Sequence, residues 1–207
     1  MRRAFALAVA AVVAAAAAAG AARADGDPAS DVLLSDNVFL SFQSPYGSEE
    51  GRVLEQLTAA AARQRFPIKV AVITQVADLG AVGGLYGRPR RYADFLGREI
   101  AFVFRGTLVV AMNGRPGGFG VHGPGATPAA RRALARMKLP RTRLTAAELA
   151  KLAAVAVQRV AEASGHHLAV PAKRKTSTWL LDAFLIGALG VAALGSAGIL
   201  LARWLRG

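Results

Sequence analysis

The sequence predicts an α/β domain, a small sheet with helices packed against it, followed by one C-terminal transmembrane helix. Two observations favour the α/β class. Short, nearly continuous apolar runs rich in β-branched residues stand at 68–74 and 106–112, and stretches of helical periodicity precede, separate and follow them. A third observation, an uncharged run of 20 residues at 183–202, predicts the membrane-spanning helix.

The beginning of the chain is typical of a secretory signal peptide. Two arginines follow the first Met, an apolar run extends over 4–22, and small residues stand on both sides of Arg23. We therefore predict residues 1–24 to be a signal peptide that is cleaved after Ala24. The alternative is an uncleaved anchor, which the alanine-rich composition disfavours because stable anchors usually contain more leucine and isoleucine.

The end of the chain predicts a membrane anchor. A helix over the uncharged run would span about 30 Å, the thickness of the hydrocarbon core of a bilayer. Trp179 and Trp204 flank this run, as interfacial tryptophans often do. We predict a transmembrane helix over 179–204 and a cytoplasmic tail over 205–207. With an exported domain before it, the protein is expected in the plasma membrane as a single-pass protein whose main domain is extracytoplasmic.

The extracytoplasmic domain is predicted over 25–163. Its first part is expected to be loop-rich, with one short edge strand. Ser48 supplies an N-cap for the first helix, and Pro67 prevents that helix from continuing. The elements expected up to residue 112 are an edge strand at 38–40, a helix over 49–65, a strand over 68–74, a break at 78–84, a helix over 89–100 and a strand over 106–112, for which 102–104 is an alternative start.

A glycine-rich stretch follows, NGRPGGFGVHGPGA at 113–126. Gly118, Gly120 and Gly123 have the spacing G-x-G-x-x-G of dinucleotide-binding loops. Such a loop opens directly into a helix and is followed by an acidic residue about 20 positions later. Here Pro124 interrupts, and 138–147 contains no carboxylate. We therefore predict a β-hairpin, with a wide turn at 113–117 and a return strand near 119–122.

Two further helices and a stalk complete the part before the membrane. Thr127-Pro128 predicts the start of the first helix, which ends before Pro140. The sequence Thr145-Ala-Ala-Glu148 is a capping box that predicts the start of the second, and Gly165 predicts its end. Residues 164–178 are predicted to form a basic stalk.

The charge distribution limits the class of partner. Residues 25–130 hold ten basic and ten acidic residues, whereas 131–175 hold eleven basic and two acidic ones. Juxtamembrane basic residues each gain about 1 kcal/mol near anionic lipid, so we predict that Lys173, Arg174 and Lys175 contact a lipid surface. A solvated, solubilising face is the equal alternative. Export excludes nucleic acid, and the expected partners are the lipid bilayer, a membrane or envelope protein, and anionic lipid or an anionic envelope polymer.

The order of the predicted elements resembles that of the TPM domain family, which is named from a thylakoid lumen protein, a photosystem II repair protein and a receptor modulator. The resemblance covers about 33–163, and the chain looks like a membrane-anchored, bacterial-type member. The motifs that carry it are KVAVIT at 69–74 with the loop Leu79-Gly80, and GTLVVAMNGR at 106–115. The resemblance implies a small α/β sheet, and acid phosphatase activity, metal binding or assistance to membrane-protein complexes.

The candidate site residues follow from the predicted strand ends. Asp36 and Asp78 are the carboxylates nearest to them and are the candidate catalytic residues, with Asn113 and Arg115 as candidate ligand-binding residues. The family's opening Asp-x-Ala-x-x-Leu motif is matched loosely by 36–40. Where relatives often carry an acid before the arginine, this chain has Asn113-Gly114-Arg115.

The functional hypothesis is a membrane-tethered extracytoplasmic TPM-like interaction or accessory module that acts on another envelope component. The alternative is a phosphatase-like or metal-binding hydrolase of the TPM type. Enzyme activity stays open, and its absence is favoured. No metal ligand set and no cofactor are predicted, because His166-His167 lacks the spacing of a metal site and the chain has no cysteine; a divalent metal remains the alternative.

Overall fold

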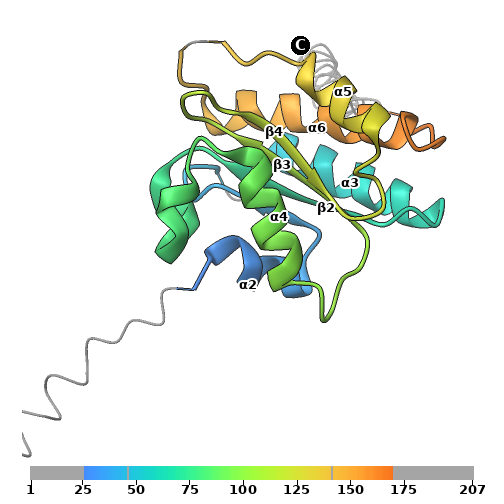
Figure 1. Ribbon diagram of the computed structural model, residues 1–207, viewed down its shortest axis with the longest axis horizontal. Helices are drawn as coiled ribbons and strands as arrows, with labels where there is room; N and C mark the ends of the chain where they lie inside the picture. Colours follow the sequence, from blue (N-terminus) through green and yellow to red (C-terminus); the bar gives the residue numbers. More distant parts are fainter. Residues whose placement is uncertain (1–25, 46, 141, 170–207) are drawn as a thin grey trace, which may run out of the picture. The chain divides into compact units, whose positions relative to one another are not determined.

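Four strands form one mixed sheet in the order β1-β2-β3-β4 (Figure 1). The structure is a computed structural model, and it describes residues 26–45, 47–140 and 142–169. β1, β2 and β3 run parallel, and β4 pairs antiparallel with β3. The strands are β1 (Val38–Leu40), β2 (Ile68–Ile73), β3 (Thr107–Met112) and β4 (Gly118–His122). This small sheet with packed helices confirms the predicted α/β class, the edge strand and the hairpin.

Helices cover both faces of the sheet. One face carries α2 (Pro28–Ser35) and α4 (Pro89–Glu99), and the other carries α3 (Glu49–Arg63), α5 (Pro128–Ala135) and α6 (Ala146–Glu162) (Figure 1). Two 3₁₀ turns, η1 (Val76–Leu85), lie between β2 and α4. The crossovers through α3 and α4 advance in one direction across the sheet but use opposite faces. One of the two therefore departs from the usual right-handed connection.

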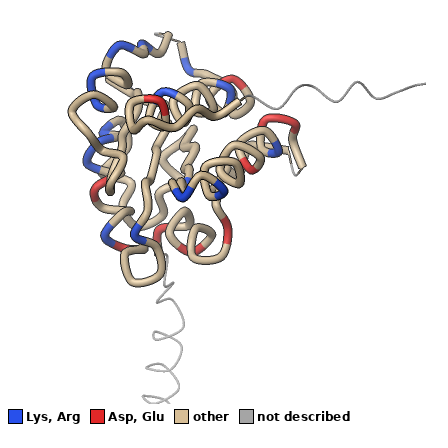
Figure 2. Tube along the Cα trace, turned by 90° about the vertical axis from the view of Figure 1, so that its right-hand side faces the viewer, with Lys and Arg blue, Asp and Glu red and all other residues tan. Residues whose placement is uncertain are grey.

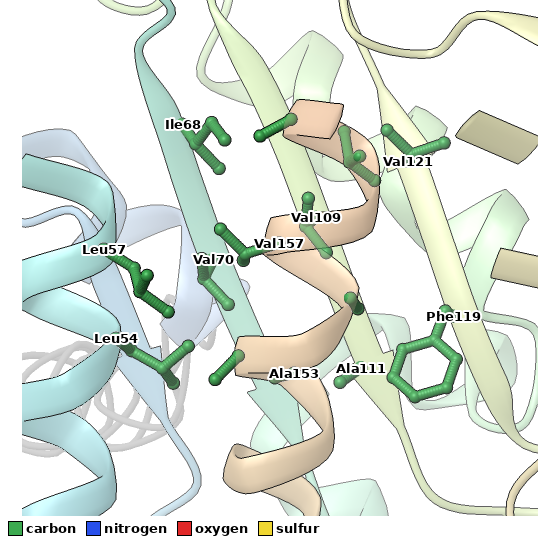
Figure 3. Packing of buried hydrophobic residues seen from close by; sticks show 14 of the residues in the cluster. Leu54, Leu57, Ile68, Val70, Val109, Ala111, Phe119, Val121, Ala153 and Val157 are labelled. Carbon is green, nitrogen blue, oxygen red and sulfur yellow. The ribbon is translucent and has the colours of Figure 1, made fainter. Parts of the chain in front are cut away.

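The core explains why the central strands are almost entirely apolar. Every residue of β2 and β3 is buried, because helices cover both sides of these strands. On one face, Leu54 and Leu57 of α3 and Val157 of α6 belong to the same cluster as Val70 and Val109 (Figure 3). The cluster on the other face includes Leu33, Ile73, Leu79, Tyr92, Leu96 and Val110.

Charged residues are nearly excluded from the strands. Lys69 is the only Lys, Arg, Asp or Glu within the four strands, and the rest of the described charges lie on helices and loops (Figure 2). Its Nζ donates to the carbonyl oxygens of Leu33 and Asp36, both at 2.7 Å, and lies 5.2 Å from the ring centre of Phe104. Lys69 thus satisfies carbonyls at the end of α2 and fixes that helix to β2.

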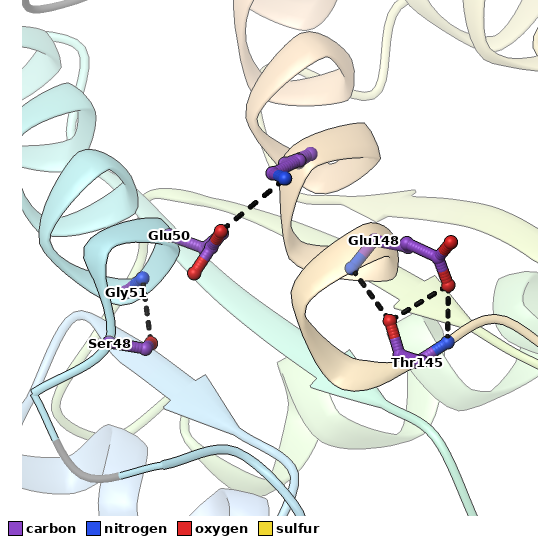
Figure 4. A network of polar contacts seen from close by, with 6 residues as sticks. Ser48, Glu50, Gly51, Thr145 and Glu148 are labelled. Carbon is purple, nitrogen blue, oxygen red and sulfur yellow. Dashed lines mark hydrogen bonds and ion pairs between the residues drawn. The ribbon is translucent and has the colours of Figure 1, made fainter. Parts of the chain in front are cut away.

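The predicted helix starts are made by side-chain caps. Ser48 Oγ accepts from Gly51 N at 3.2 Å at the start of α3. At the start of α6, Thr145 Oγ1 accepts from Glu148 N at 3.3 Å, and Glu148 Oε2 accepts from Thr145 N at 2.8 Å (Figure 4). The predicted capping box is therefore present. An ion pair of 3.5 Å between Glu50 Oε1 and Lys151 Nζ joins the two helices.

The three spaced glycines serve the hairpin. Gly118 and Gly123 have φ angles of 134° and 85°, which residues with a side chain rarely adopt. At Gly120, a Cβ would lie 2.1 Å from the carbonyl oxygen of Pro89, so only glycine lets α4 approach β4 this closely. The spacing that resembles a dinucleotide loop thus has a packing role.

Two predictions about this domain are wrong. Residues 25–47 were expected to be loop-rich, but 28–35 form α2, with Asp27 as N-cap and Pro28 in the first turn. The alternative start of the third strand at 102–104 is a turn after α4. Phe102 there is 75% exposed, whereas a strand at that place would bury it.

The contacts of the domain continue past residue 163. The ring of His166 stacks on Phe66 with centres 4.5 Å apart, and Leu168 is buried against the α3 and α6 side of the core. Gln64 Nε2 donates to the carbonyl oxygen of His167 at 2.9 Å. The first residues of the predicted stalk, 164–169, thus pack on the domain.

Several predicted segments lie outside the described residues. They are the signal peptide at 1–24, the stalk from 170 on, the transmembrane helix at 179–204 and the tail at 205–207. These stay predictions. In the ranges that the structure describes, no helix combines the length and the apolar character needed to cross a bilayer.

Candidate functional site

Polar side chains gather where the three parallel strands end. Ser41 follows β1, Thr74 follows β2 and Asn113 follows β3, and all three are buried. The hydroxyls of Ser41 and Thr74 share a hydrogen bond, and Asn113 Nδ2 donates to the carbonyl oxygen of Thr74 at 3.4 Å. This edge is the usual place for a ligand in α/β folds. The strand-end cluster consists of Ser41, Thr74, Asp78, Tyr86, Asn113 and Arg143.

Asp78 belongs to this cluster, and its carboxylate is occupied by donors from its own loop. The residue is fully buried. Its Oδ2 accepts from Thr74 N at 2.8 Å, from Gln75 N at 3.1 Å and from Thr74 Oγ1 at 3.3 Å, and Oδ1 faces Gln75 Nε2 at 3.5 Å. The carboxylate therefore holds the turn after β2 in place, which is a structural task.

The carbonyl oxygen of Thr74 joins the rest of the cluster. It accepts from Tyr86 Oη at 2.8 Å and from Arg143 Nη2 at 3.0 Å, in addition to Asn113. Burial raises the pKa of the Tyr86 phenol, so the hydroxyl keeps its proton and donates. Asn113 Nδ2 also reaches the carbonyl oxygen of Leu144 at 2.8 Å. The cluster thus ties the loop before α6 to the ends of β2 and β3.

The structure separates the two candidate catalytic carboxylates. Asp36 precedes β1 and Asp78 follows β2, and these strands are parallel. They therefore lie at opposite edges of the sheet, roughly 15–20 Å apart at about 3.3 Å per strand residue. Ser35 Oγ donates to the Asp36 carboxylate at 3.1 Å. No shared site of these two carboxylates is formed.

The two candidate ligand-binding residues lie in different surroundings. Asn113 lies in the strand-end cluster, whereas Arg115 is exposed in the turn between β3 and β4. The guanidinium that enters the cluster belongs to Arg143, which the sequence reasoning missed. No local pattern around Arg143 distinguishes it from the other arginines of its segment. Lys173, Arg174 and Lys175 lie outside the described residues.

The carboxyl of Asp27 is buried and was not predicted from the sequence. It lies at the start of α2, on the face of the sheet that α2 and α4 cover. Tyr92 Oη donates to both oxygens of Asp27, at 2.8 Å and 2.9 Å. Burial raises the pKa of the Asp27 carboxyl from 3.8 to about 6, and the hydrogen bond from Tyr92 opposes that shift. Burial likewise raises the pKa of the Tyr92 phenol. The sequence Asp27-Pro28 has the pattern of an N-cap followed by proline, which was the available signal.

An open groove of about 610 Å³ lies between the start of α4, the hairpin turn and the end of α5. Arg90 and Arg91 line it from α4 and Arg88 from the N-cap of that helix, and Leu134 and Met137 line it from α5 and the residues after it. The remaining lining residues are Gly87, Pro89, Pro116, Gly117, Gly118, Phe119 and Ala135. We call this surface the arginine groove. A smaller recess of about 130 Å³ continues it along β4, between Arg90, Asp94, Phe119, Val121, Arg131 and Leu134.

Within the described ranges, no three His, Asp or Glu side chains come together as a metal site. His122 Nδ1 and Asp94 Oδ1 form a pair at 3.0 Å. His166 stacks on Phe66. The strand-end cluster contains a single carboxylate, that of Asp78.

Comparisons of the chain with known protein families, curated proteins and solved structures find no match. The resemblance to TPM domains therefore stays a prediction from the quoted motifs.

Proposed function

We propose that the chain is a membrane-tethered extracytoplasmic interaction or accessory module of TPM type that acts on another envelope component. The observation that carries this proposal is the arginine groove. Exposed guanidinium groups opposite apolar side chains suit the binding of another molecule. The signal peptide and the transmembrane helix predicted from the sequence supply the tether and the export.

The alternative is a phosphatase-like or metal-binding hydrolase that uses Asp36 and Asp78. Phosphate hydrolysis needs a nucleophile or a metal-held water beside groups that stabilise negative charge. Asp36 and Asp78 lie at opposite edges of the sheet, and donors occupy Oδ2 of Asp78. No observation on the described residues favours this alternative.

Site-specific crosslinking in cells that express the full-length chain tests the proposal. A photo-reactive amino acid at Ala135, which is exposed and lines the groove, is expected to capture a membrane or envelope protein. The same amino acid at Ala62, exposed on α3 across the sheet, is the matched control. Equal capture from both positions, or none from either, would count against an interaction module at this surface.

Export has its own test, because the chain contains no cysteine. An Ala62→Cys variant gives one exposed thiol on the domain. A membrane-impermeant maleimide applied to intact spheroplasts is expected to label it. Labelling only after lysis would place the domain in the cytoplasm and contradict the proposal.

The hydrolase alternative is tested on the full-length chain with a generic phosphate ester, with and without divalent metal. We expect no turnover above background. Turnover that disappears in Asp36→Asn or Asp78→Asn, with the folded state intact by circular dichroism, would reverse the order of the two proposals.

A further inference from the structure

The floor of the arginine groove is the open edge of the sheet. β4 is the last strand in the order β1-β2-β3-β4, so one side of it has no strand partner within 26–45, 47–140 and 142–169. α4 belongs to the core cluster on one face and α5 to the cluster on the other, so these helices flank this edge from opposite faces. Phe119 of β4 lines both the groove and its smaller recess.

The hydrogen-bonding pattern shows which backbone groups face outward. Thr107 N donates to Pro67 O and Asn113 N donates to Ile73 O, so the odd-numbered residues of β3 face β2. The even-numbered residues of β3 therefore face β4, where they pair with Gly118, Gly120 and His122. The N–H and C=O groups of Phe119 and Val121 consequently point away from β3. Among the described residues, none donates to or accepts from these groups.

The two walls of the groove differ in chemistry. The wall from α4 carries Arg88, Arg90 and Arg91, at the helix start where the helix dipole also favours negative charge. The opposite wall carries Leu134 and Met137. In the smaller recess beside Val121, the α4 side also carries Asp94 and the α5 side Arg131, so the contrast between the walls belongs to the main groove. In a strand added to β4, successive side chains would point alternately to these two walls. Such a strand matches the groove when acidic and apolar residues alternate along it.

We infer that the open edge of β4 binds an extended acidic segment of a partner protein as an added strand. The inference rests on the proposed interaction function and names the chemistry of its partner. Main-chain groups of Phe119 and Val121 supply the pairing, and the arginine wall selects acidic side chains.

Charge decides against two other occupants, and hydrogen bonding decides against a third. A second copy pairing through its own β4 would bring two arginine walls together. The segments of this chain outside the described residues are also unsuitable, because 1–25 carries three arginines and one acid, and 170–207 carries five basic residues and one acid. An anionic lipid headgroup fits the arginines but makes no use of the outward N–H groups. A peptide strand uses both.

The test is fluorescence anisotropy of labelled hexapeptides with the full-length chain in a mild, uncharged detergent. The probe is (Glu-Val)₃, and its counterpart is (Lys-Val)₃. We expect binding of the acidic peptide that weakens with salt, and at least tenfold weaker binding of the lysine peptide. Equal binding of both, or binding of neither, would overturn the inference.

Backbone pairing is tested by N-methylation of alternate amides in the acidic peptide, which leaves the protein unchanged. If the peptide adds antiparallel to β4, the backbone amides of its valines face β4. If it adds parallel, the backbone amides of its glutamates face β4. Methylation of one set is expected to abolish binding, and methylation of the other to be tolerated. If both sets are tolerated, or both abolish binding, the edge is not the site.

The arginine wall is tested by Arg90→Ser with Arg91→Ser. Both side chains are exposed, so the fold should not depend on them. The double variant should bind the acidic peptide about threefold to tenfold more weakly. Arg52→Ser with Arg63→Ser on α3 is the matched control and should bind as the unchanged chain does.

A last experiment distinguishes binding to a lipid surface from binding to a protein partner. Flotation with phosphatidylglycerol vesicles should be equal for the Arg90, Arg91 variant and its control. Vesicle binding that needs these arginines, without peptide binding, would replace the peptide by a lipid surface. If Ala135 crosslinks to a partner protein but the acidic peptide does not bind, the inference of an acidic strand at β4 would be wrong, whereas the proposed interaction function would still be supported.

Discussion

Asp27→Asn tests whether a buried ionisable group controls the pH dependence of stability. Asp27 is 5% exposed, and both of its oxygens accept from Tyr92 Oη. Burial raises the pKa of this carboxyl from 3.8 to about 6. Asparagine has the same shape, accepts at the helix start as aspartate does, and cannot ionise.

The sign follows from the direction of the shift. A folded pKa above the unfolded one means that the unfolded chain loses its proton first as pH rises. The stabilising contribution of Asp27 to the free energy of unfolding is therefore fully present below about pH 4. It falls between about pH 4 and pH 6, and above pH 6 it has been lost. A rise of the pKa from 3.8 to about 6 corresponds to at most about 3 kcal/mol.

Urea unfolding of the full-length chain and of Asp27→Asn, followed by circular dichroism at several pH values from 4 to 7.5, measures the difference. We expect near-equal stability at pH 4 and a variant that is more stable by up to about 3 kcal/mol at pH 7.5. Because all other titrating groups are shared, the difference isolates Asp27. A difference that stays constant with pH, or a variant that is less stable at pH 7.5, would refute the reasoning.

Three further substitutions test the fold around the candidate surfaces by the same unfolding measurement. Gly120→Ala should destabilise by about 1–3 kcal/mol, because its methyl group would lie 2.1 Å from Pro89 O. The control Gly84→Ala, whose methyl group would meet none of the described atoms within 4 Å, should be near neutral. Thr145→Ala should cost about 1 kcal/mol through the lost cap, and no change would contradict the capping box. Asp78→Asn should cost about 1–3 kcal/mol, because its amide turns a donor toward backbone N–H groups; an unchanged free energy of unfolding would show that these bonds are dispensable.

The elements predicted correctly are those whose signals are local. β2 and β3 are mostly apolar and buried on both faces, and the capping box at Thr145 is complete within four residues. α2 has a local start signal in Asp27-Pro28, but over its eight residues nothing comparable marks where it ends. Its carbonyls at the C-terminal end are satisfied by Lys69, which is 36 residues from Leu33 in the chain. A helix stabilised by such a distant donor cannot be read from its own segment.

The candidate site was predicted only in part for a similar reason. Proximity to a strand end in the sequence does not say at which edge of the sheet a residue lies. Asn113 follows a strand and lies in the strand-end cluster, whereas Asp36 precedes a strand and lies at the opposite edge. The arginine of the cluster, Arg143, reaches the carbonyl oxygen of Thr74 across 69 residues of sequence. Only the packing of α6 brings it there.

The carboxyl edge of a parallel sheet usually binds the ligand because its loops leave polar groups without partners. In this chain those groups bind one another: Asp78 accepts two backbone amides, and the carbonyl oxygen of Thr74 accepts from Tyr86, Asn113 and Arg143. An incoming ligand would have to replace bonds that already exist. At β4 the described residues offer no hydrogen-bond partner to the outward N–H and C=O groups of Phe119 and Val121. The proposed partner strand would add hydrogen bonds there without breaking any in the protein, which is why we place it at the edge of the sheet and not at the strand-end cluster.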